Sequence, residues 1–316
     1  MRKFIIEVKV FMLSILVISA IVQALVDIRI KGKMVRGHDN IDFVKNQDND
    51  LVFLGSSRCW GHFDPHLFEK RLDLKAVNIG VEGHSELTMH IIRLKDYLLK
   101  NRAPRFAILN FDPFIEAGSF TQNNNFIHKN DFARYAYHCP KEDEPFVNYF
   151  RFNFAERTIP LYALLKYKLF FDCLTLTNVS NWAIYGYAKN DISWDTLANP
   201  VADARDYLKY YFDTTGSNMA RIMDRLDSLN KMCQQAHIKL ICVQTPVYQA
   251  IYLKPYFAKS GQICHALNIP FFETNSDSLD GNINYFYNAN HLNMIGVELM
   301  TNNLFSDPDF LGQFLQ

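Results

Sequence analysis

The chain has 316 residues and a mass of 36.8 kDa, and 49% of its residues are hydrophobic, which is enough apolar material for one full-size α/β domain. With only 13 glycines and 11 prolines, a collagen-like or disordered chain is excluded. Lys and Arg number 33, and Asp and Glu also number 33, so no global basic excess indicates a nucleic-acid partner.

The N-terminus is basic although the whole chain is neutral. Residues 1–36 carry seven basic and two acidic side chains, and the rest of the chain is net acidic. Within this segment, Val10 to Val26 is a run of seventeen residues without a charge. As a helix the run would be about 25 Å long, against a bilayer core of roughly 30 Å. The long side chains of Lys9 and Arg29 can extend its reach to the membrane interface.

Residues 1–33 are therefore predicted to be an N-terminal membrane anchor or signal segment. An uncleaved anchor is favoured, because the apolar run continues past Ala24 without a polar break. A signal peptide cleaved after Val22-Gln23-Ala24 stays open, and so does a buried core helix. Either export interpretation places residues 34–316 outside the cytoplasm, facing the periplasm or the cell exterior.

Short apolar runs alternate with helical patterns along most of the remaining chain. This alternation predicts a parallel sheet covered by helices on both faces. The predicted strands lie within residues 51–57, 75–80, 106–111, 238–246 and 269–274. The predicted helices lie at 65–72, 85–100, about 219–233, 255–267 and 292–305, with a loop at 275–290.

The alternation breaks between about residues 114 and 215. This stretch is rich in aromatic residues and includes NYFRFNF at 148–154 and YLKYYF at 207–212. It is too long for a loop in a compact domain, so it is predicted to be a helical or mixed insertion. Two roles stay open: packing against the core, or forming a lid or substrate wall with stacking aromatics.

The chain contains 6 cysteines without a CxxC or Cys/His spacing typical of a zinc site. They are Cys59, Cys139, Cys173, Cys233, Cys242 and Cys264. The last three lie at apolar positions of predicted elements, which favours core packing over disulfide bridging. No metal site and no cofactor are predicted.

Four polar motifs stand at the ends of predicted elements. They are Gly55-Ser56-Ser57-Arg58, Asn78-Ile79-Gly80-Val81-Glu82-Gly83-His84, Leu109-Asn110-Phe111-Asp112 and Asn288-Ala289-Asn290-His291-Leu292-Asn293. The carboxyl ends of parallel strands share one edge of a sheet, where ligands usually bind. Each motif alone is weak evidence, since a serine after a strand is more often a helix cap and a lone histidine is more often structural.

Together, the four motifs resemble the SGNH (GDSL-type) hydrolase superfamily, over residues 51–112 and 238–305. The resemblance implies a three-layer α/β/α, flavodoxin-like fold with a five-stranded parallel sheet. The GSSR start, the NxGxxG block and the HLNxxG ending are also similar to membrane-anchored relatives that act on surface polysaccharides. Those relatives include the alginate O-acetylation proteins and the lipoteichoic-acid D-alanylation protein.

The resemblance implies acyl transfer through an acyl-serine. Ser57 takes the place of the nucleophile, His291 that of the general base, and Asn288 that of the residue that orients the histidine. The backbone N–H groups of Ser57 and Gly83, with the Asn110 amide, would form the oxyanion hole.

Two further residues of the motifs have open roles. Asp112 is the fallback for Asn110 and a candidate contact to substrate. Arg58 would bind an anionic group of the substrate or, alternatively, hold its loop through a salt bridge.

Two features depart from the family pattern. The usual Gly-x-Asn-Asp block is absent, and Asn288 stands where the family has an aspartate. An amide oxygen can accept the imidazole N–H but cannot stabilise imidazolium by charge, and loss of that carboxylate in a serine protease costs about 10⁴ in kcat. Asp277 and Asp280, in the same predicted loop, are alternative orienting groups.

Gly83-His84-Ser85 also looks like the start of a G-x-S-x-G nucleophile elbow, but position 87 is Leu rather than a small residue, which disfavours Ser85 as the nucleophile.

The favoured function is an extracytoplasmic serine esterase or O-acyltransferase that takes an acyl donor and a cell-envelope glycan acceptor. One alternative is a weak or inactive relative that binds glycan or scaffolds a membrane-bound acyltransferase. Another is a purely structural envelope protein.

Overall fold

The computed structural model describes residues 1–30, 47–80, 85–116, 159–162, 165, 186–201, 203–212, 214 and 216–315. The chain divides into two compact units. One unit comprises Met1–Phe43 and Ile127–Ser180, and the other comprises Val44–Phe126 and Asn181–Gln316.

The N-terminal segment forms one helix, α1 (Arg2–Ile30), of 29 residues. Its stretch Arg2–Val26 has a mean hydropathy of 2.5 and none of it is buried. At 1.5 Å per residue, α1 is about 43 Å long, so it is long and apolar enough to cross a membrane. Large apolar side chains of α1 such as Phe11 and Leu13 are exposed, which favours the anchor or signal interpretation over a buried core helix.

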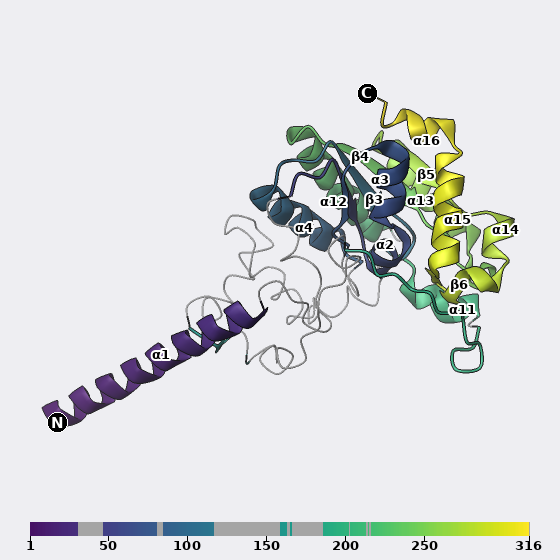
Figure 1. Ribbon diagram of the computed structural model, residues 1–316. Coiled ribbons are helices and arrows are strands. Elements are labelled where there is room, and N and C mark those ends of the chain that lie inside the picture. Colours follow the sequence, from purple (N-terminus) through teal and green to yellow (C-terminus); the bar gives the residue numbers. More distant parts are fainter. Residues whose placement is uncertain are drawn as a thin grey trace. The chain divides into compact units, whose positions relative to one another are not determined.

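A five-stranded parallel sheet organises the second unit (Figure 1). Its strands are β1 (Leu51–Leu54), β2 (Ala76–Asn78), β3 (Phe106–Asn110), β4 (Lys239–Gln244) and β5 (Phe271–Glu273). The strand order is β2-β1-β3-β4-β5, the order of flavodoxin-like folds. Val52 of β1 lies between Val77 of β2 and Ala107 of β3, so β1 is an inner strand, and β3 is the central strand of the sheet.

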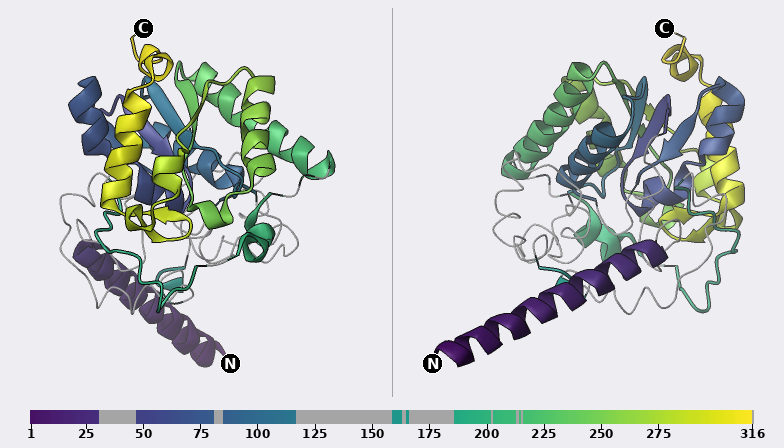
Figure 2. Two further views of the ribbon diagram at one scale, coloured as in Figure 1. Left: turned by 90° about the vertical axis from the view of Figure 1, so that its right-hand side faces the viewer. Right: turned by 60° about the vertical axis from the view of Figure 1, so that its left-hand side comes forward.

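Helices cover both faces of this sheet (Figure 2). Alternate residues of β1 point to opposite faces, and all four are fully buried. Leu51 and Phe53 pack with α3 (Pro65–Leu72), α15 (Met294–Phe305) and α16 (Pro308–Gly312). Val52 and Leu54 pack with α4 (Leu87–Lys100), α12 (Gly216–Gln235) and α13 (Lys254–Ala266). The predicted α/β class, with a parallel five-stranded sheet between two helical layers, is confirmed.

Several short elements were not predicted. They are α2 (Ser57–His62), α11 (Ala204–Tyr207), η2 (Leu208–Tyr210), η3 (Gln249–Ile251), α14 (Asp277–Asp280), η4 (Ile283–Tyr285), β6 (Phe286–Asn288) and β7 (His291–Leu292). Four of them fall in or beside residues 275–290, so the prediction that this stretch is a loop is wrong. β6 and β7 pair antiparallel as a small hairpin, with an irregularity between Phe286 and Asn288.

Most of the predicted insertion at about 114–215, including NYFRFNF, lies outside the described residues. Within the second unit, Tyr211 and Phe212 are buried. The Tyr211 ring packs 4.9 Å from that of Phe114 and 4.9 Å from that of Tyr256. For this end of the insertion, the core-packing role is the one observed.

Cys233, Cys242 and Cys264 are buried free thiols, as expected for core packing, and Cys59 is a buried free thiol as well. Cys139 and Cys173 lie outside the described residues.

Candidate active site

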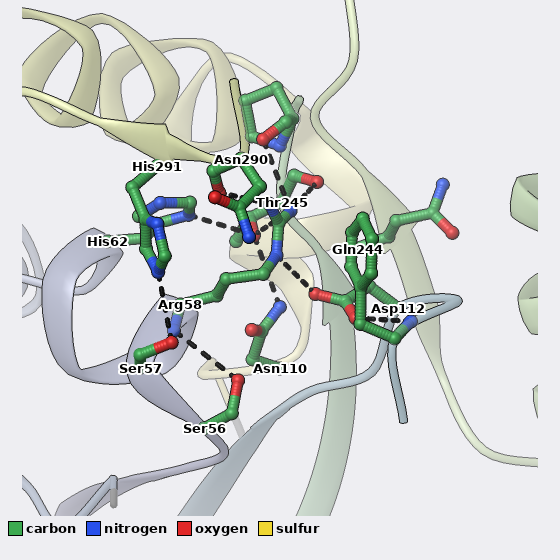
Figure 3. Close-up of polar contacts among 12 residues, drawn as sticks. Ser56, Ser57, Arg58, His62, Asn110, Asp112, Gln244, Thr245, Asn290 and His291 are labelled. Carbon is green, nitrogen blue, oxygen red and sulfur yellow. Dashed lines mark hydrogen bonds and ion pairs between the residues drawn. The ribbon is translucent and has the colours of Figure 1, made fainter. Parts of the chain in front are cut away.

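The predicted site residues come from three elements at the carboxyl edge of the sheet (Figure 3). Ser57 and Arg58 begin α2, directly after β1. Asn110 ends β3, with Asp112 two residues later. Asn288 and His291 belong to the β6–β7 hairpin.

A glycine makes the turn from β1 into α2 possible. Gly55 has φ +150°, and a Cβ there would lie 2.6 Å from Cys59 Cβ and 2.9 Å from Asn110 Cβ. Ser56 then caps the helix, its side chain accepting the Arg58 N–H at 3.4 Å. Ser57 is consequently the first helical residue, and its backbone N–H has no acceptor within the helix.

The second motif holds α2 in place. Asn78 Nδ2 donates to the carbonyl oxygens of Cys59, at 2.8 Å, and Phe63, at 2.9 Å. A Cβ on Gly80 would lie 3.0 Å from the backbone nitrogen of Trp60, so the chain passes close to the helix. Gly83 lies outside the described residues, and its oxyanion role stays a prediction.

Ser57 and His291 face each other across the site. His291 Nε2 lies 2.9 Å from Ser57 Oγ, and His291 Nδ1 lies 3.0 Å from Asn288 Oδ1. Asn288 Oδ1 also accepts the Asn290 N–H at 3.1 Å. Because an amide oxygen can only accept, the imidazole proton sits on Nδ1 and the lone pair of Nε2 faces the serine hydroxyl. This geometry allows His291 to take the proton of Ser57.

The orienting partner is the amide at position 288 rather than either alternative carboxylate. Asp280 accepts instead from Asn275 Nδ2 at 2.9 Å.

Burial, and then the nearby charge of Arg58, lower the pKa of His291 to about 3. The ring is therefore in its neutral, basic form across the physiological pH range.

The side chain of Arg58 is buried, with 2% of the residue exposed. Its Nε donates to Asp112 Oδ2 at 2.6 Å, and its Nη1 donates to the Asn290 carbonyl at 2.5 Å. Its Nη2 has three acceptors, which are the Thr245 carbonyl at 2.7 Å, Thr245 Oγ1 at 2.8 Å and the Pro246 carbonyl at 3.1 Å. Of its two predicted roles, the salt bridge is the one observed. A substrate contact is incompatible with this burial.

Asp112 likewise has no oxygen open to substrate. It is 3% exposed, and while Oδ2 accepts from Arg58, Oδ1 accepts the Phe114 N–H at 3.0 Å. The prediction of Asp112 as a substrate contact is therefore corrected. A buried carboxylate needs its partner charge, and Arg58 supplies it.

The amide of Asn110 faces β4. Its Nδ2 lies 3.3 Å from both the Val243 carbonyl and Thr245 Oγ1. Its buried Oδ1 has no hydrogen-bond partner among the described residues. The predicted oxyanion role would require the amide to turn about its Cβ–Cγ bond, which would also let Thr245 Oγ–H donate to the amide oxygen.

His62 and Thr245 belong to the site but were missed by sequence reasoning. His62 is fully buried, and its Nε2 accepts the Leu292 N–H at 3.0 Å. Its Nδ1 lies 2.9 Å from Thr245 Oγ1. The available signal was a histidine five residues after Ser57, which becomes informative only once α2 is known.

Among the described residues, no three or more His, Cys, Asp or Glu side chains are grouped so that they could hold a metal ion.

Comparison with known proteins finds structural likeness only. No family model matches the chain, and no curated protein matches it. A GDSL-like lipase from Bacteroides thetaiotaomicron VPI-5482 aligns over 83% of this chain and 88% of its own, with 11% identity and a TM-score of 0.39. A psychrotrophic esterase from Pseudoalteromonas sp. aligns over 85% of this chain and 99% of its own, with 12% identity and a TM-score of 0.38. These scores are low, so the fold class rests on the sheet topology.

Proposed function

We propose that this protein is a serine-dependent acyl-transfer enzyme, an esterase or an O-acyltransferase. The observation that carries the proposal is the 2.9 Å separation of His291 Nε2 from Ser57 Oγ. A serine hydroxyl is a weak nucleophile at neutral pH and needs a base within hydrogen-bond reach. The order of the four motifs, similar to that of SGNH hydrolases, supports the same conclusion.

The reaction begins when His291 Nε2 takes the Ser57 proton as Oγ attacks an ester carbonyl. The tetrahedral oxyanion accepts from the Ser57 N–H, with Gly83 and Asn110 as further proposed donors. Collapse of the intermediate breaks the ester C–O bond, and His291 returns the proton to the leaving alcohol. Water or a sugar hydroxyl, deprotonated by His291, then attacks acyl-Ser57 and releases the serine.

For the substrate, we propose acyl esters of a cell-envelope glycan. The support is the basic N-terminal segment, the length and apolar character of α1, and the similarity of the motifs to polysaccharide-modifying relatives. In this proposal α1 anchors the chain, the α/β domain faces the periplasm or the cell exterior, and a membrane-bound acyltransferase is a candidate partner that supplies the acyl group.

Asn288 favours a second candidate function. Without a carboxylate behind His291, the imidazolium that forms during attack has no charged partner on Nδ1. A catalytically weak or inactive protein that binds glycan or scaffolds a membrane acyltransferase would tolerate this.

Covalent labelling of the full-length chain in detergent with a fluorophosphonate separates the two functions. The first predicts a single adduct on Ser57, which is lost in Ser57→Ala and kept in Ser260→Ala. Ser260 is a suitable control because it is fully buried and its hydroxyl has no hydrogen-bond partner among the described residues. Absence of labelling in the folded wild-type chain would contradict acyl-serine chemistry and favour the second function.

A second measurement distinguishes the esterase from the acyltransferase. With p-nitrophenyl acetate as acyl donor, an esterase releases acetate at a rate that added oligosaccharide leaves unchanged. A transferase instead yields an acetylated oligosaccharide, which mass spectrometry detects.

A further inference from the structure

Two side chains of α2 hold the backbone on either side of His291. Arg58 Nη1 donates to the carbonyl of Asn290, the residue before His291, at 2.5 Å. His62 Nε2 accepts the N–H of Leu292, the residue after it, at 3.0 Å. The same six-residue helix begins with Ser57. One short element therefore carries the hydroxyl and both of these contacts to the backbone beside His291.

Thr245 joins these two side chains to the sheet. Its Oγ1 accepts from Arg58 Nη2 at 2.8 Å and lies 2.9 Å from His62 Nδ1. Thr245 directly follows β4 and is fully buried. Through Thr245, Arg58 and His62 are thus connected to the carboxyl end of β4, an inner strand of the sheet.

His62 can serve in this way only as a neutral ring. The Leu292 N–H is an obligate donor, so His62 Nε2 must present its lone pair and Nδ1 must carry the proton, which it donates to Thr245. Burial, followed by the charge of Arg58, lowers the pKa of His62 well below its usual value. The environment thus keeps His62 in the neutral form that accepts the Leu292 N–H.

The hairpin that carries His291 is short. β7 is two residues long, and its pairing with β6 is irregular. Asn288 gives the imidazole one uncharged hydrogen bond. Further contacts come from other elements: the Tyr248 N–H donates to the Ala289 carbonyl at 2.9 Å, and the Tyr287 ring stacks on that of His291 with centroids 5.3 Å apart. The helix α2 adds the two backbone contacts directly on either side of His291.

We propose that His62 and Arg58 are positioning residues, which set the approach of His291 Nε2 to Ser57 Oγ by clamping the backbone on both sides of the base. This inference rests on the proposed acyl-serine function. A displacement of about 1 Å between reacting groups can cost on the order of 10²-fold in rate. The clamp should therefore affect the rate of acylation and leave substrate affinity unchanged.

The first test replaces His62 in the full-length chain. His62→Phe keeps the ring volume but removes the acceptor for Leu292, whereas the amide oxygen of His62→Gln can still accept that N–H. We expect His62→Phe to lower the fluorophosphonate labelling rate of Ser57 about 10- to 100-fold. We expect kcat for p-nitrophenyl acetate to fall in parallel with little change in KM, and His62→Gln to restore most of the rate.

The second test, which does not depend on how His62→Phe folds, changes Thr245. Thr245→Val removes the shared acceptor at nearly constant shape, and Thr245→Ser keeps it. Thr301→Val on α15 is the matched control, because Thr301 is 2% exposed and its hydroxyl has no hydrogen-bond partner among the described residues. We expect slower labelling for Thr245→Val only, in chains whose thermal unfolding shows that they are folded.

The outcomes separate this inference from the function on which it rests. Labelling of Ser57 that persists at the wild-type rate in folded His62→Phe and Thr245→Val overturns the clamp and leaves the acyl-serine function intact. Equal losses in His62→Phe and His62→Gln also overturn it, because the Leu292 acceptor would then be irrelevant. Wild-type chain that does not label at Ser57 at all removes the proposed function, and the clamp with it.

Discussion

Asn288 accepts the Nδ1–H of His291 at 3.0 Å with an uncharged oxygen. The residue fixes the tautomer of the base, which is one of the two tasks that a carboxylate performs in a serine triad. The other task is the electrostatic stabilisation of imidazolium, and no charged group at this position performs it.

The substitution Asn288→Asp supplies the missing charge. One carboxylate oxygen can accept from both His291 Nδ1 and the Asn290 N–H, as the amide oxygen does now. We expect the labelling rate of Ser57 at pH 7 to rise at least tenfold, since the reverse change costs about 10⁴ in kcat in a serine protease. Asn288→Ala, which removes the acceptor, is the control and should lower the rate. An Asn288→Asp chain that labels no faster than wild type would contradict this account of the site.

The pH dependence of labelling reports the pKa of His291. Burial and Arg58 lower that pKa to about 3, so the base stays deprotonated well below its usual value of 6.5. The labelling rate should therefore hold as the pH falls through 6 and 5, and decline only near pH 3. In Asn288→Asp this acid limb should move to higher pH, because the new charge favours imidazolium. A wild-type midpoint near 6.5 would show that the ring is solvated like a free histidine.

At this scale, sequence reasoning located Ser57, His291 and Asn288 through the order of the motifs, although their catalytic roles stay predictions. It could not choose between the two roles of Arg58, because the choice depends on which carbonyl groups surround the guanidinium. It missed Thr245 and His62 because their importance lies in hydrogen bonds to residues far away in sequence.

The helix α2 depends on the turn at Gly55, which connects it to β1. The Gly55→Ala substitution places a Cβ 2.6 Å from Cys59 Cβ, at a φ of +150° that side chains rarely adopt. We expect a loss of stability of about 1–3 kcal/mol and markedly slower labelling of Ser57. Thermal unfolding and labelling rate measure the two effects.

Gly61→Ala, within the same helix, is the matched control. A Cβ there meets nothing within 4 Å, and alanine is the better helix former by about 1 kcal/mol. This variant should be as stable as wild type or more so. Similar losses in the two variants would mean that α2 as a whole tolerates no substitution, and that the turn at Gly55 has no special role.

Strands such as β1 (Leu51–Leu54) and β4 (Lys239–Gln244) could be predicted because they are largely buried, mostly apolar runs that end at turn residues. The predicted strands were too long at their carboxyl ends, since Gly55 and Thr245 leave the sheet to build the site. The helix α2 and the β6–β7 hairpin were missed because six-residue and two-residue elements are too short to show a periodic pattern.

For the whole molecule, the anchoring proposal makes its own prediction. An uncleaved α1 predicts that the mature protein keeps its full mass of 36.8 kDa and stays with membranes after an alkaline carbonate wash. Removal of residues 1–33 should release it. A mature chain that begins just after Ala24 would instead show a cleaved signal peptide.

The two groups of the proposed catalytic pair are separated by 234 positions in sequence. Ser57 emerges from the ribosome early, whereas His291, and the β4 end that supports it, are among the later parts to be made. A nascent or prematurely terminated chain thus carries an ordinary, unreactive alcohol. Under the proposed mechanism, activation of Ser57 therefore waits until position 291 has been synthesised and the β6–β7 hairpin has folded against α2.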